Sequence, residues 1–597
     1  MRLITKILKQ ISKFLQKLGL LTMYYTADFE TTTDPDDCRV WAWGVCSIDS
    51  PDDFIYGIDL DEFMDFCEHS KNARLYFHNL KFDGEFILCW LFANGFTLVT
   101  DKKEITDKSF MTLISDTGLF YAMTIYWKAG KKQRKVTLYD SLKVLPFSVK
   151  AVAKAFGLPI NKLEIDYHEK RPKGHELTAM EVKYLNHDVK IMALALKQLF
   201  DQDLTAMTTG SNALKNYKET LGRFQFERVF PTPEHDADIR QSYKGGFTWL
   251  KPEYAGKDIG AGIVLDVNSL YPAVMKYCPM PYGEPRYFEG QYKENRLYNL
   301  YVQMIRCSFE LKPGRVPTIQ MKGNLSFVPT EYVSSSAGLE VALCLTSVDL
   351  ALFLEQYEVM NLEYISGWMF KSKVGLFDEY IDKWTAIKTQ ATIDGNKAMR
   401  TLAKLMLNSL YGKFALSPLV RSRYPVYRDG VISYSLGPQE TRSAIYIPVG
   451  TFITSWARNK TIRAAQLLYD RFIYADTDSL HLLGTEIPQQ LMIDDVELGF
   501  WKHETTFSQA RFIRAKTYME YGKDPKKDEP ESWKVTCAGM PEKCHEQVTF
   551  DNFKPGSRYT GKLVPRHVKG GIVLVDTEFT IRKEGKEDDH QANDPTA

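Results

Sequence analysis

The chain has 597 residues, in which 76 Lys and Arg nearly balance 75 Asp and Glu. This length is too great for one compact core, so about two to four domains are expected. A net charge near zero does not by itself indicate a nucleic-acid partner, and any basic surface must be local. The nine cysteines include no CxxC pair, which argues against a zinc site or a disulfide framework and indicates reduced intracellular thiols. No apolar run approaches the roughly 18 residues that cross a bilayer, so a soluble protein is expected.

Residues 1–22 are basic and amphipathic. The segment carries five cations and no acid, and its apolar residues recur at helical spacing: Ile4, Ile7, Leu8, Ile11, Leu15 and Leu18. Lysines interrupt the apolar run that a signal peptide needs. We hypothesise that this helix contacts an anionic membrane surface. The alternative is a dispensable extension, with translation starting at Met23.

The rest of the chain changes pattern several times. From Tyr24 to about residue 205, strand-like and helical stretches alternate, as in an α/β domain. Residues from about 275 to 370 are irregular, with short strand signals, and residues 378–414 are helical with a break near Gly395. Residues from about 415 to 450 predict a β-hairpin with Asp429-Gly430 as its turn. Residues 583–597 have little to bury and predict a disordered acidic tail.

A first group of acids gathers in the α/β region. A predicted buried strand ends in Asp28-Phe29-Glu30, and strand alternation places the two acids on one face. Asp83 follows in the segment His78–Asp83, and Asp188 follows Tyr184 by four residues on a predicted helix. Four clustered carboxylates require cations, and two Mg²⁺ or Mn²⁺ ions would suit them. The DFE motif alone is more often a surface acid pair, so the hypothesis depends on the whole set.

A second group of acids lies further along the chain. An apolar strand runs into Asp266, and another runs into Asp476-Thr477-Asp478 at the predicted tip of a hairpin. These three acids also predict a site for two metal ions, of the kind used in phosphoryl transfer.

A predicted helix between these strands carries cations and an aromatic residue on one face. Lys397, Arg400, Lys404, Asn408 and Tyr411 have helical spacing. Such a face suits the phosphates and the base of a nucleotide. Taken alone, a solvated basic face is the simpler explanation.

The order of these motifs resembles that of a known enzyme family. DxE at Asp28, NxxFD ending at Asp83 and YxxxD from Tyr184 resemble the exonuclease motifs of the DEDDy proofreading family. DxxSLYP, KxxxNSLYG and YxDTDS resemble motifs A, B and C of family B DNA polymerases. The insertions after motifs A and B resemble those of the protein-primed subgroup, in particular the phi-twenty-nine-like phage polymerases. The resemblance covers about residues 23–582, although the loop before the motif B helix is longer than usual.

The resemblance implies roles for individual residues. In the exonuclease, Asp28, Glu30, Asp83 and Asp188 would bind metal, Tyr184 would orient the attacking water, and Lys162 would assist. The frayed DNA strand would contact Thr31, His78, Asn79, Phe82, Ser141 and Leu142. In the polymerase, Asp266, Asp478 and the Val267 carbonyl would bind metal, with Asp476 in support. The nucleotide would contact Tyr271, Lys388, Lys404 and Tyr411. The primer strand would contact Tyr243, Gly245 and Gly246, Thr454 and Arg458, and Lys516 and Tyr518.

These expectations define a multidomain α/β enzyme. An RNase-H-like 3′→5′ exonuclease domain, residues 23–205, would precede a polymerase domain, residues 206–582, with palm, fingers and thumb. Two insertions, at about 275–370 and 415–450, would be the terminal-protein regions. The implied cofactors are two Mg²⁺ or Mn²⁺ ions per site and dNTP substrates. The implied partners are template and primer DNA, a terminal protein and a single-stranded-DNA-binding protein, for a monomer in the host cytoplasm.

Three other functions fit part of the pattern. One is a DNA-primed family B polymerase of a mobile element. Another is an inactive nucleic-acid-binding scaffold, against which the presence of every required carboxylate argues. A nuclease alone would have no use for the NSLYG helix and the DTDS hairpin.

Overall fold

The computed structural model describes residues 22–583 except 71, 131–132, 168, 233 and 321–330. The predicted amphipathic segment, apart from residue 22, and the predicted acidic tail, apart from residue 583, lie outside the described residues. Within the described part of the chain, no helix is long and apolar enough to span a membrane.

The first sheet carries the strand that ends in the DFE motif. Its order is β3-β2-β1-β4-β8-β7-β6-β5, and β1 pairs parallel with β4 but antiparallel with β2. The strands are β1 (Tyr24–Thr31), β2 (Val40–Ser47), β3 (Phe54–Gly57), β4 (Arg74–Phe77), β5 (Thr97–Leu98), β6 (Ser109–Ile114), β7 (Phe120–Lys128) and β8 (Arg134–Asp140). The helices of this region are α2 (Leu60–His69), α3 (Leu80–Ala93), α4 (Val149–Ala155) and α5 (Ala179–Phe200). Phe29 packs against Phe63 and Phe77 in the core, so alternation turns Asp28 and Glu30 to the face covered by α5.

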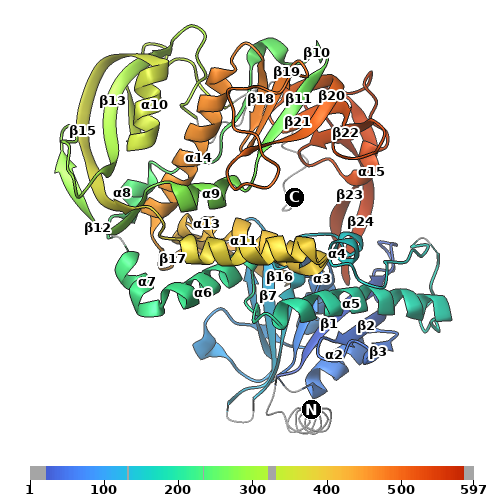
Figure 1. Ribbon diagram of the computed structural model, residues 1–597. Helices are drawn as coiled ribbons and strands as arrows, with labels where there is room; N and C mark the ends of the chain where they lie inside the picture. The colour runs from blue at the N-terminus through green and yellow to red at the C-terminus, as the bar shows by residue number, and fades with distance from the viewer. Residues whose placement is uncertain are drawn as a thin grey trace.

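Three helices connect this region to a second sheet, which lies on the far side of α11 (Asp378–Ile393) in Figure 1. The connecting helices are α6 (Thr209–Leu221), α7 (Arg223–Val229) and α8 (Asp236–Arg240). The second sheet has the order β22-β21-β20-β11-β19-β18-β9, and β10 pairs with β20. Its strands are β9 (Thr248–Leu250), β10 (Asp258–Ile259), β11 (Gly262–Val267), β18 (Phe472–Asp476), β19 (Ser479–Leu483), β20 (Trp501–Arg514), β21 (Thr517–Lys523) and β22 (Ser532–Cys537). Helices α9 (Leu270–Tyr277) and α14 (Ile447–Leu467) pack together beside it.

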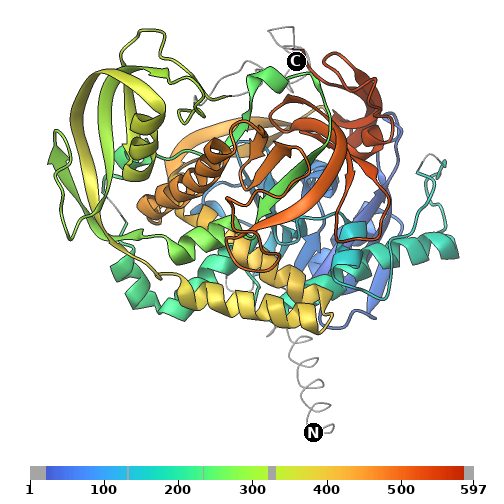
Figure 2. The same ribbon diagram turned by 45° about the horizontal axis from the view of Figure 1, so that its top comes forward.

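The region of irregular pattern forms a sheet of its own, which Figure 2 shows at one end of the molecule. Its order is β12-β15-β13-β14. The elements are β12 (Met280–Glu289), β13 (Leu300–Leu311), β14 (Val341–Thr346), α10 (Ser347–Gln356) and β15 (Tyr357–Lys373). The expectation of only short strands was therefore wrong, since β15 alone spans 17 residues. Irregular alternation of buried and exposed residues along β15 hides the strand from periodicity arguments.

The helical region divides into α11, α12 (Lys397–Ser409) and α13 (Tyr411–Phe414). The break between α11 and α12 lies at Gly395, which has a φ of +66°, and Asn396 caps α12 through the Met399 N–H. The five predicted side chains do not share a single helix, because α12 ends at Ser409 and Tyr411 begins α13.

Two long hairpins complete the described chain. The predicted hairpin at 415–450 is β16 (Leu419–Arg428) and β17 (Val431–Thr441), with Asp429 and Gly430 both at positive φ in its turn. The other hairpin, β23 (Arg558–Val568) and β24 (Gly571–Thr580), follows the short helix α15 (Glu542–His545). Figure 1 shows that it reaches from the second sheet to the first domain, where β24 contacts α3 and β23 contacts β17.

Candidate active sites

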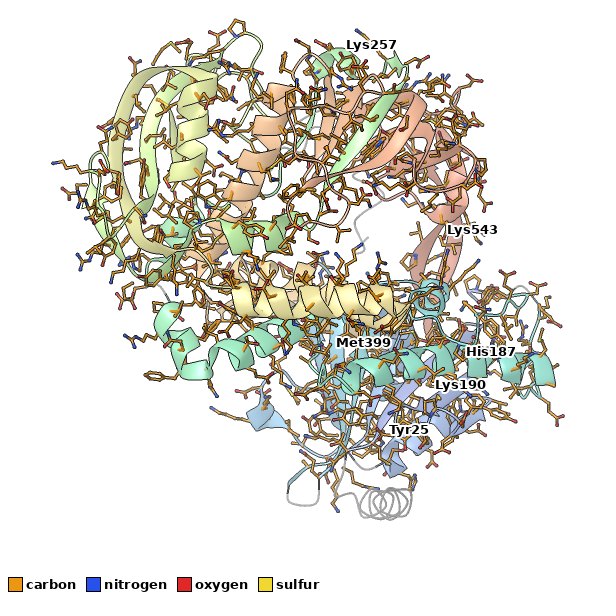
Figure 3. All side chains as sticks on the ribbon, in the orientation of Figure 1. Tyr25, His187, Lys190, Lys257, Met399 and Lys543 are labelled. Atoms are coloured by element: carbon orange, nitrogen blue, oxygen red, sulfur yellow. The ribbon has the colours of Figure 1, made fainter. Side chains whose placement is uncertain are left out.

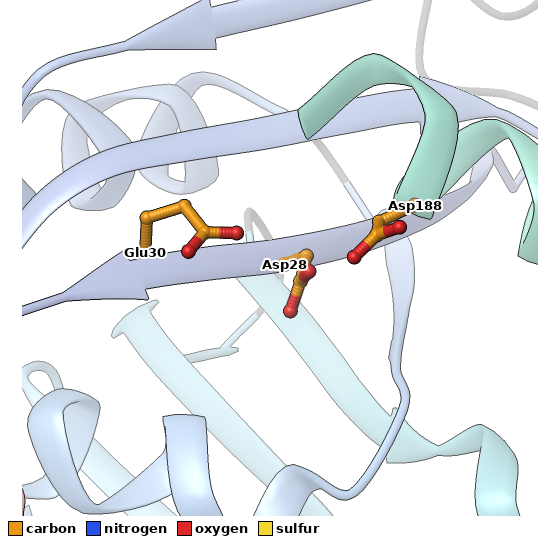
Figure 4. Close-up of side chains that lie close together, drawn as sticks. All are labelled: Asp28, Glu30 and Asp188. Carbon is orange, nitrogen blue, oxygen red and sulfur yellow. The ribbon is translucent and has the colours of Figure 1, made fainter. Parts of the chain in front are cut away.

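Three of the four acids predicted for the first site converge between β1 and α5. Carboxylate oxygens of Asp28, Glu30 and Asp188 lie within 4.8 Å of one another, and Figure 4 shows the three side chains close together between β1 and α5. Asp83 lies on α3 beside them, and its Oδ1 accepts the Phe29 N–H at 3.3 Å. The sequence argument thus placed all four acids in one region, and three of them form the tight group.

The electrostatics of this group favour a bound cation. Burial, followed by repulsion from Asp188, raises the pKa of Asp28 to about 7, although Lys162 opposes the shift. Burial and Asp28 also raise the pKa of Glu30 and of Asp83. Among the described residues, the buried Oδ1 of Asp188 has no hydrogen-bond partner. Buried, mutually repelling oxygen ligands of this kind fit Mg²⁺ or Mn²⁺.

Lys162 and two tyrosines border the same group. Lys162 forms an ion pair with Asp188, and its ammonium lies 5.2 Å from the centre of the Tyr184 ring. The Tyr184 hydroxyl lies 2.5 Å from that of Tyr167, a residue that the sequence reasoning missed. Tyr167 precedes α5 in a segment without regular structure, so no periodic pattern marks it. His187 and Lys190, which flank Asp188 on α5, are marked in Figure 3.

The residues expected to contact a frayed strand surround the start of α3. Thr31 ends β1, Phe82 lies in the first turn of α3, and both are partly exposed. Asn79 precedes α3 in the left-handed conformation. His78 contacts the hydroxyl of Ser141 at 3.0 Å, and Leu142 follows Ser141 in a short 3-10 helix, Ser141–Lys143. Ser141 is fully buried and donates to the Phe77 carbonyl, and its contact with DNA stays a prediction.

The second group of acids lies where β11 meets the turn between β18 and β19. Asp266 is paired across the sheet with Ser479, and the Val267 N–H donates to the carbonyl of Asp478 at 2.8 Å. A cavity of about 370 Å³ is lined by Asp266, Asp476 and Asp478. Burial, then repulsion from Asp478 and from Glu504, raises the pKa of Asp266 to about 7. Glu504, which the sequence reasoning missed, is a further acid at this cavity.

Asp476 differs from its neighbours because a lysine neutralises it. The Lys516 ammonium lies 2.8 and 3.0 Å from the two carboxylate oxygens of Asp476. Tyr518 is buried behind this pair and stacks on Phe512 with ring centres 5.1 Å apart. Lys516 and Tyr518 both line the cavity, and Tyr518 is the more buried of the two.

An aromatic pair and four cations adjoin this second site. The rings of Tyr271 on α9 and Tyr411 on α13 stack with centres 4.0 Å apart. Burial and the nearby cations Arg400, Lys404 and Lys502 lower the pKa of Lys388. The sequence reasoning missed Lys502, because only the pairing of β20 with β11 shows that this residue lies opposite Asp266. Such a concentration of positive charge suits a polyphosphate.

The glycine segment before β9 fits closely against the acidic turn. A Cβ on Gly246 would lie 2.8 Å from the Thr477 hydroxyl oxygen, whereas one on Gly245 would meet nothing within 4 Å. The buried guanidinium of Arg458 on α14 donates to the carbonyls of Lys244 and Gly245 at 2.8 and 2.7 Å. Tyr243, at the start of this segment, packs near Tyr271 and Tyr411.

Two expected DNA ligands are instead enclosed by protein. Arg458 is 2% exposed and forms an ion pair of 2.5 Å with Asp349 on α10. Thr454 is also 2% exposed, and its hydroxyl donates to backbone carbonyls of α14. Contact of these two residues with the primer stays a prediction. Arg458 acts on the Tyr243–Gly246 segment, because that segment and Asp349 take up its donors.

The sequence profile described as DNA polymerase type B, organellar and viral, matches residues 66–175 and 164–495. The chain belongs to the type B DNA polymerases. It is 47% identical over 575 residues to the DNA polymerases of Bacillus phages B103 and phi29, covering 94% of this chain and 99% of each relative. The polymerase is also 32% identical over 590 residues to that of Streptococcus phage Cp-1, with the same coverage.

A solved structure of phi29 DNA polymerase with primer-template DNA superposes on this polymerase with a TM-score of 0.89 at 45% identity. The match covers 94% of this chain and 100% of that one. The predicted fold class is therefore confirmed: an exonuclease domain is followed by a polymerase domain with palm, fingers and thumb. The polymerase carries the polymerisation and 3′→5′ exonuclease activities of its family.

The close approach of Gly246 to Thr477 predicts unequal effects at adjacent glycines. Gly246→Ala should slow primer extension several-fold, because its methyl group would displace Thr477 between Asp476 and Asp478. Gly245→Ala, where the added methyl has room, should slow extension less. Single-turnover extension of a primed oligonucleotide measures both, and equal rates in the two variants would contradict the packing argument.

Proposed function

We propose that this polymerase replicates a linear viral genome from its ends, that a terminal protein primes it, and that it displaces the non-template strand while proofreading. The observation that carries the proposal is the presence of two separate carboxylate groups on two sheets of one chain. The phage relatives, which match over nearly their whole length, support the viral setting. One relative with this architecture, phi29 DNA polymerase, has been solved with primer-template DNA and with single-stranded DNA, which are the partners proposed for this chain.

In the exonuclease site, Asp28, Glu30, Asp83 and Asp188 would hold the metal ions. Divalent ions supply neutralisation of the acids and activation of the attacking oxygen in both sites. Tyr184 would orient the water through its hydroxyl, which Tyr167 holds in place at 2.5 Å. Lys162, paired with Asp188, would keep that carboxylate aligned and lower the negative charge near the scissile phosphate.

In the polymerase site, Asp266, Asp478 and the Val267 carbonyl would hold the metal ions. The hydrogen bond from Val267 to Asp478 fixes the two ligand segments relative to each other. Lys388 and Lys404 would bind the triphosphate together with Arg400 and Lys502, since the other three cations lie close enough to Lys388 to lower its pKa. Tyr271, stacked on Tyr411, would lie under the sugar and exclude a 2′-hydroxyl by its bulk.

The proposed partners differ in how much supports them. Single-stranded-DNA-binding protein and the terminal protein are proposed from family resemblance, with the polymerase acting as a monomer inside the host cell. The sheet β12-β15-β13-β14 is the proposed docking region for the terminal protein. It is tied to the polymerase site by the ion pair between Asp349 and Arg458.

The two metal sites should be separable, because their ligands come from segments that do not overlap. Asp478→Asn should raise the activation free energy of nucleotide addition by about 4 kcal/mol, which slows the reaction roughly a thousandfold. The same variant should still excise single-stranded DNA. Asp28→Ala should do the reverse. Primer extension and exonuclease assays on both variants check this. Loss of both activities in either variant, with the fold intact by circular dichroism, would contradict two independent sites.

Protein priming predicts a covalent product. Purified polymerase mixed with a candidate terminal protein, Mg²⁺ and labelled dATP should yield a nucleotide joined to that protein. Asp478→Asn serves as the matched control and should give no labelled protein. Label found only on DNA primers would remove the protein-priming part of the proposal and favour a DNA-primed polymerase.

The hairpin β16–β17 predicts a role in strand separation, because in the chain it joins α13, whose Tyr411 stacks on Tyr271, to α14, which carries Arg458. Replacing residues 421–442 with a short Gly and Ser linker should spare extension on an open template. It should sharply reduce synthesis through duplex DNA and the length made per binding event. A folded deletion variant that copies duplex DNA at the wild-type rate would place strand separation elsewhere.

A further inference from the structure

Helix α3 carries two buried acids that face opposite ways. Asp83 and Glu85 are two residues apart, and successive helical residues differ by about 100°, so their side chains leave opposite faces. Asp83 faces β1, where it accepts the Phe29 N–H. Glu85 faces away from β1 and is 0% exposed. One face of the helix therefore contacts β1 through Asp83, and the opposite face carries Glu85.

The partners of Glu85 come from the two long hairpins. The Tyr434 hydroxyl on β17 donates to Oε1 of Glu85 at 2.6 Å, and Nδ1 of His567 on β23 lies 3.5 Å from Oε2. Among the described residues, neither that Oε2 nor that Nδ1 has a hydrogen-bond partner, so each is left facing the other. Burial and Glu85 raise the pKa of Tyr434 well above its usual range, which keeps its hydroxyl a donor.

Apolar contacts hold the same hairpins against the exonuclease domain. Ile432 and Ile572, one from each hairpin, are 1% exposed and belong to the hydrophobic core around Phe29. The ring of Tyr427 stacks on Phe92 at the end of α3, with centres 5.4 Å apart. The tips also contact each other, since the Gly570 N–H donates to the Gly430 carbonyl at 3.1 Å. Both hairpins are therefore packed against the exonuclease domain next to α3.

The start of α3 has no side-chain cap. Asn79, which precedes the helix, has a φ of +78° and makes no side-chain cap bond. Its backbone N–H instead donates to Asp140 at 3.0 Å. A buried carboxylate is costly unless partners satisfy it, so Glu85 ties the helix to Tyr434 and His567 more specifically than an apolar residue would.

We propose that Glu85 is a positioning residue for the exonuclease. Through Tyr434 and His567 it fastens the hairpins β16–β17 and β23–β24 to the back of α3, and this holds Asp83 against β1. The inference rests on the proposed role of Asp83 as a metal ligand. Excision would then depend on the placement of two hairpins that belong, in sequence, to the polymerase half of the chain. Nucleotide addition would not depend on Glu85 in this way, because Asp266 and Asp478 lie on a different sheet.

The test measures excision of a single-stranded oligonucleotide against Mg²⁺ concentration. Glu85→Ala and His567→Ala should raise the Mg²⁺ needed for half-maximal excision several-fold, because a displaced Asp83 binds the ion less well. Tyr434→Phe should have a smaller effect in the same direction. Glu85→Gln, which still accepts from Tyr434, should recover most of the wild-type response. Extension of a short primer on an open template by Glu85→Ala and His567→Ala should match wild type.

Arg423→Ala is the matched control. Arg423 also attaches β16 to the exonuclease domain, but it does so by donating at 2.6 Å to the carbonyl of Asp116, which lies between β6 and β7 and not on α3. Its Mg²⁺ response should equal that of wild type. Wild-type Mg²⁺ responses in His567→Ala and Tyr434→Phe would overturn the proposal, even if Glu85→Ala lost excision through misfolding. A wild-type protein that excises nothing would instead contradict the proposed exonuclease function itself.

Discussion

Repulsion between buried carboxylates is the constraint on which both sites depend. Asp28 and Asp266 each have a pKa raised to about 7 by burial and by a neighbouring acid, so neither cluster is stable without compensation. Each cluster is carried by strands whose neighbouring apolar side chains lie in a hydrophobic core, such as Phe29 on β1 and Val264 on β11. Rigid strands keep the oxygens together where flexible loops would let them separate.

The two clusters solve the same electrostatic problem in the same way. In each, one acid is paired with a lysine from outside the motif: Lys162 with Asp188, and Lys516 with Asp476. Burial still raises the pKa of Asp28, Glu30, Asp266 and Asp478, and it raises the pKa of Asp188 despite Lys162, so a cation is still needed in both groups. A lysine next to a metal site thus reduces the repulsion that the ion must offset, and it also sets the direction in which its carboxylate points.

The parts of the structure that sequence predicted are those with local signals. Strands that run into acids, the Asp429-Gly430 turn and the break at Gly395 each follow from the residues at that place. Local signals could not identify three other residues. Lys502 and Glu504 reach the polymerase site through the pairing of β20 with β11, and Tyr167 reaches Tyr184 from a segment without regular structure. Burial of Arg458 was also invisible, since its partner Asp349 lies in a region whose pattern hid a whole sheet.

The ion pair between Arg458 and Asp349 constrains how this sequence can evolve, because each of the two residues compensates the charge of the other. The guanidinium of Arg458, enclosed beside the glycine segment, has its counter-ion on α10, which packs on the sheet β12-β15-β13-β14. Removing that region would leave a buried charge without a partner. Uncompensated buried charges cost roughly 3–5 kcal/mol, a large share of the stability of a typical domain. An insertion of this kind is not a detachable accessory. Loss of Asp349 would leave the charge of Arg458 uncompensated unless the arginine were replaced as well, so we expect changes in the two segments to be coupled.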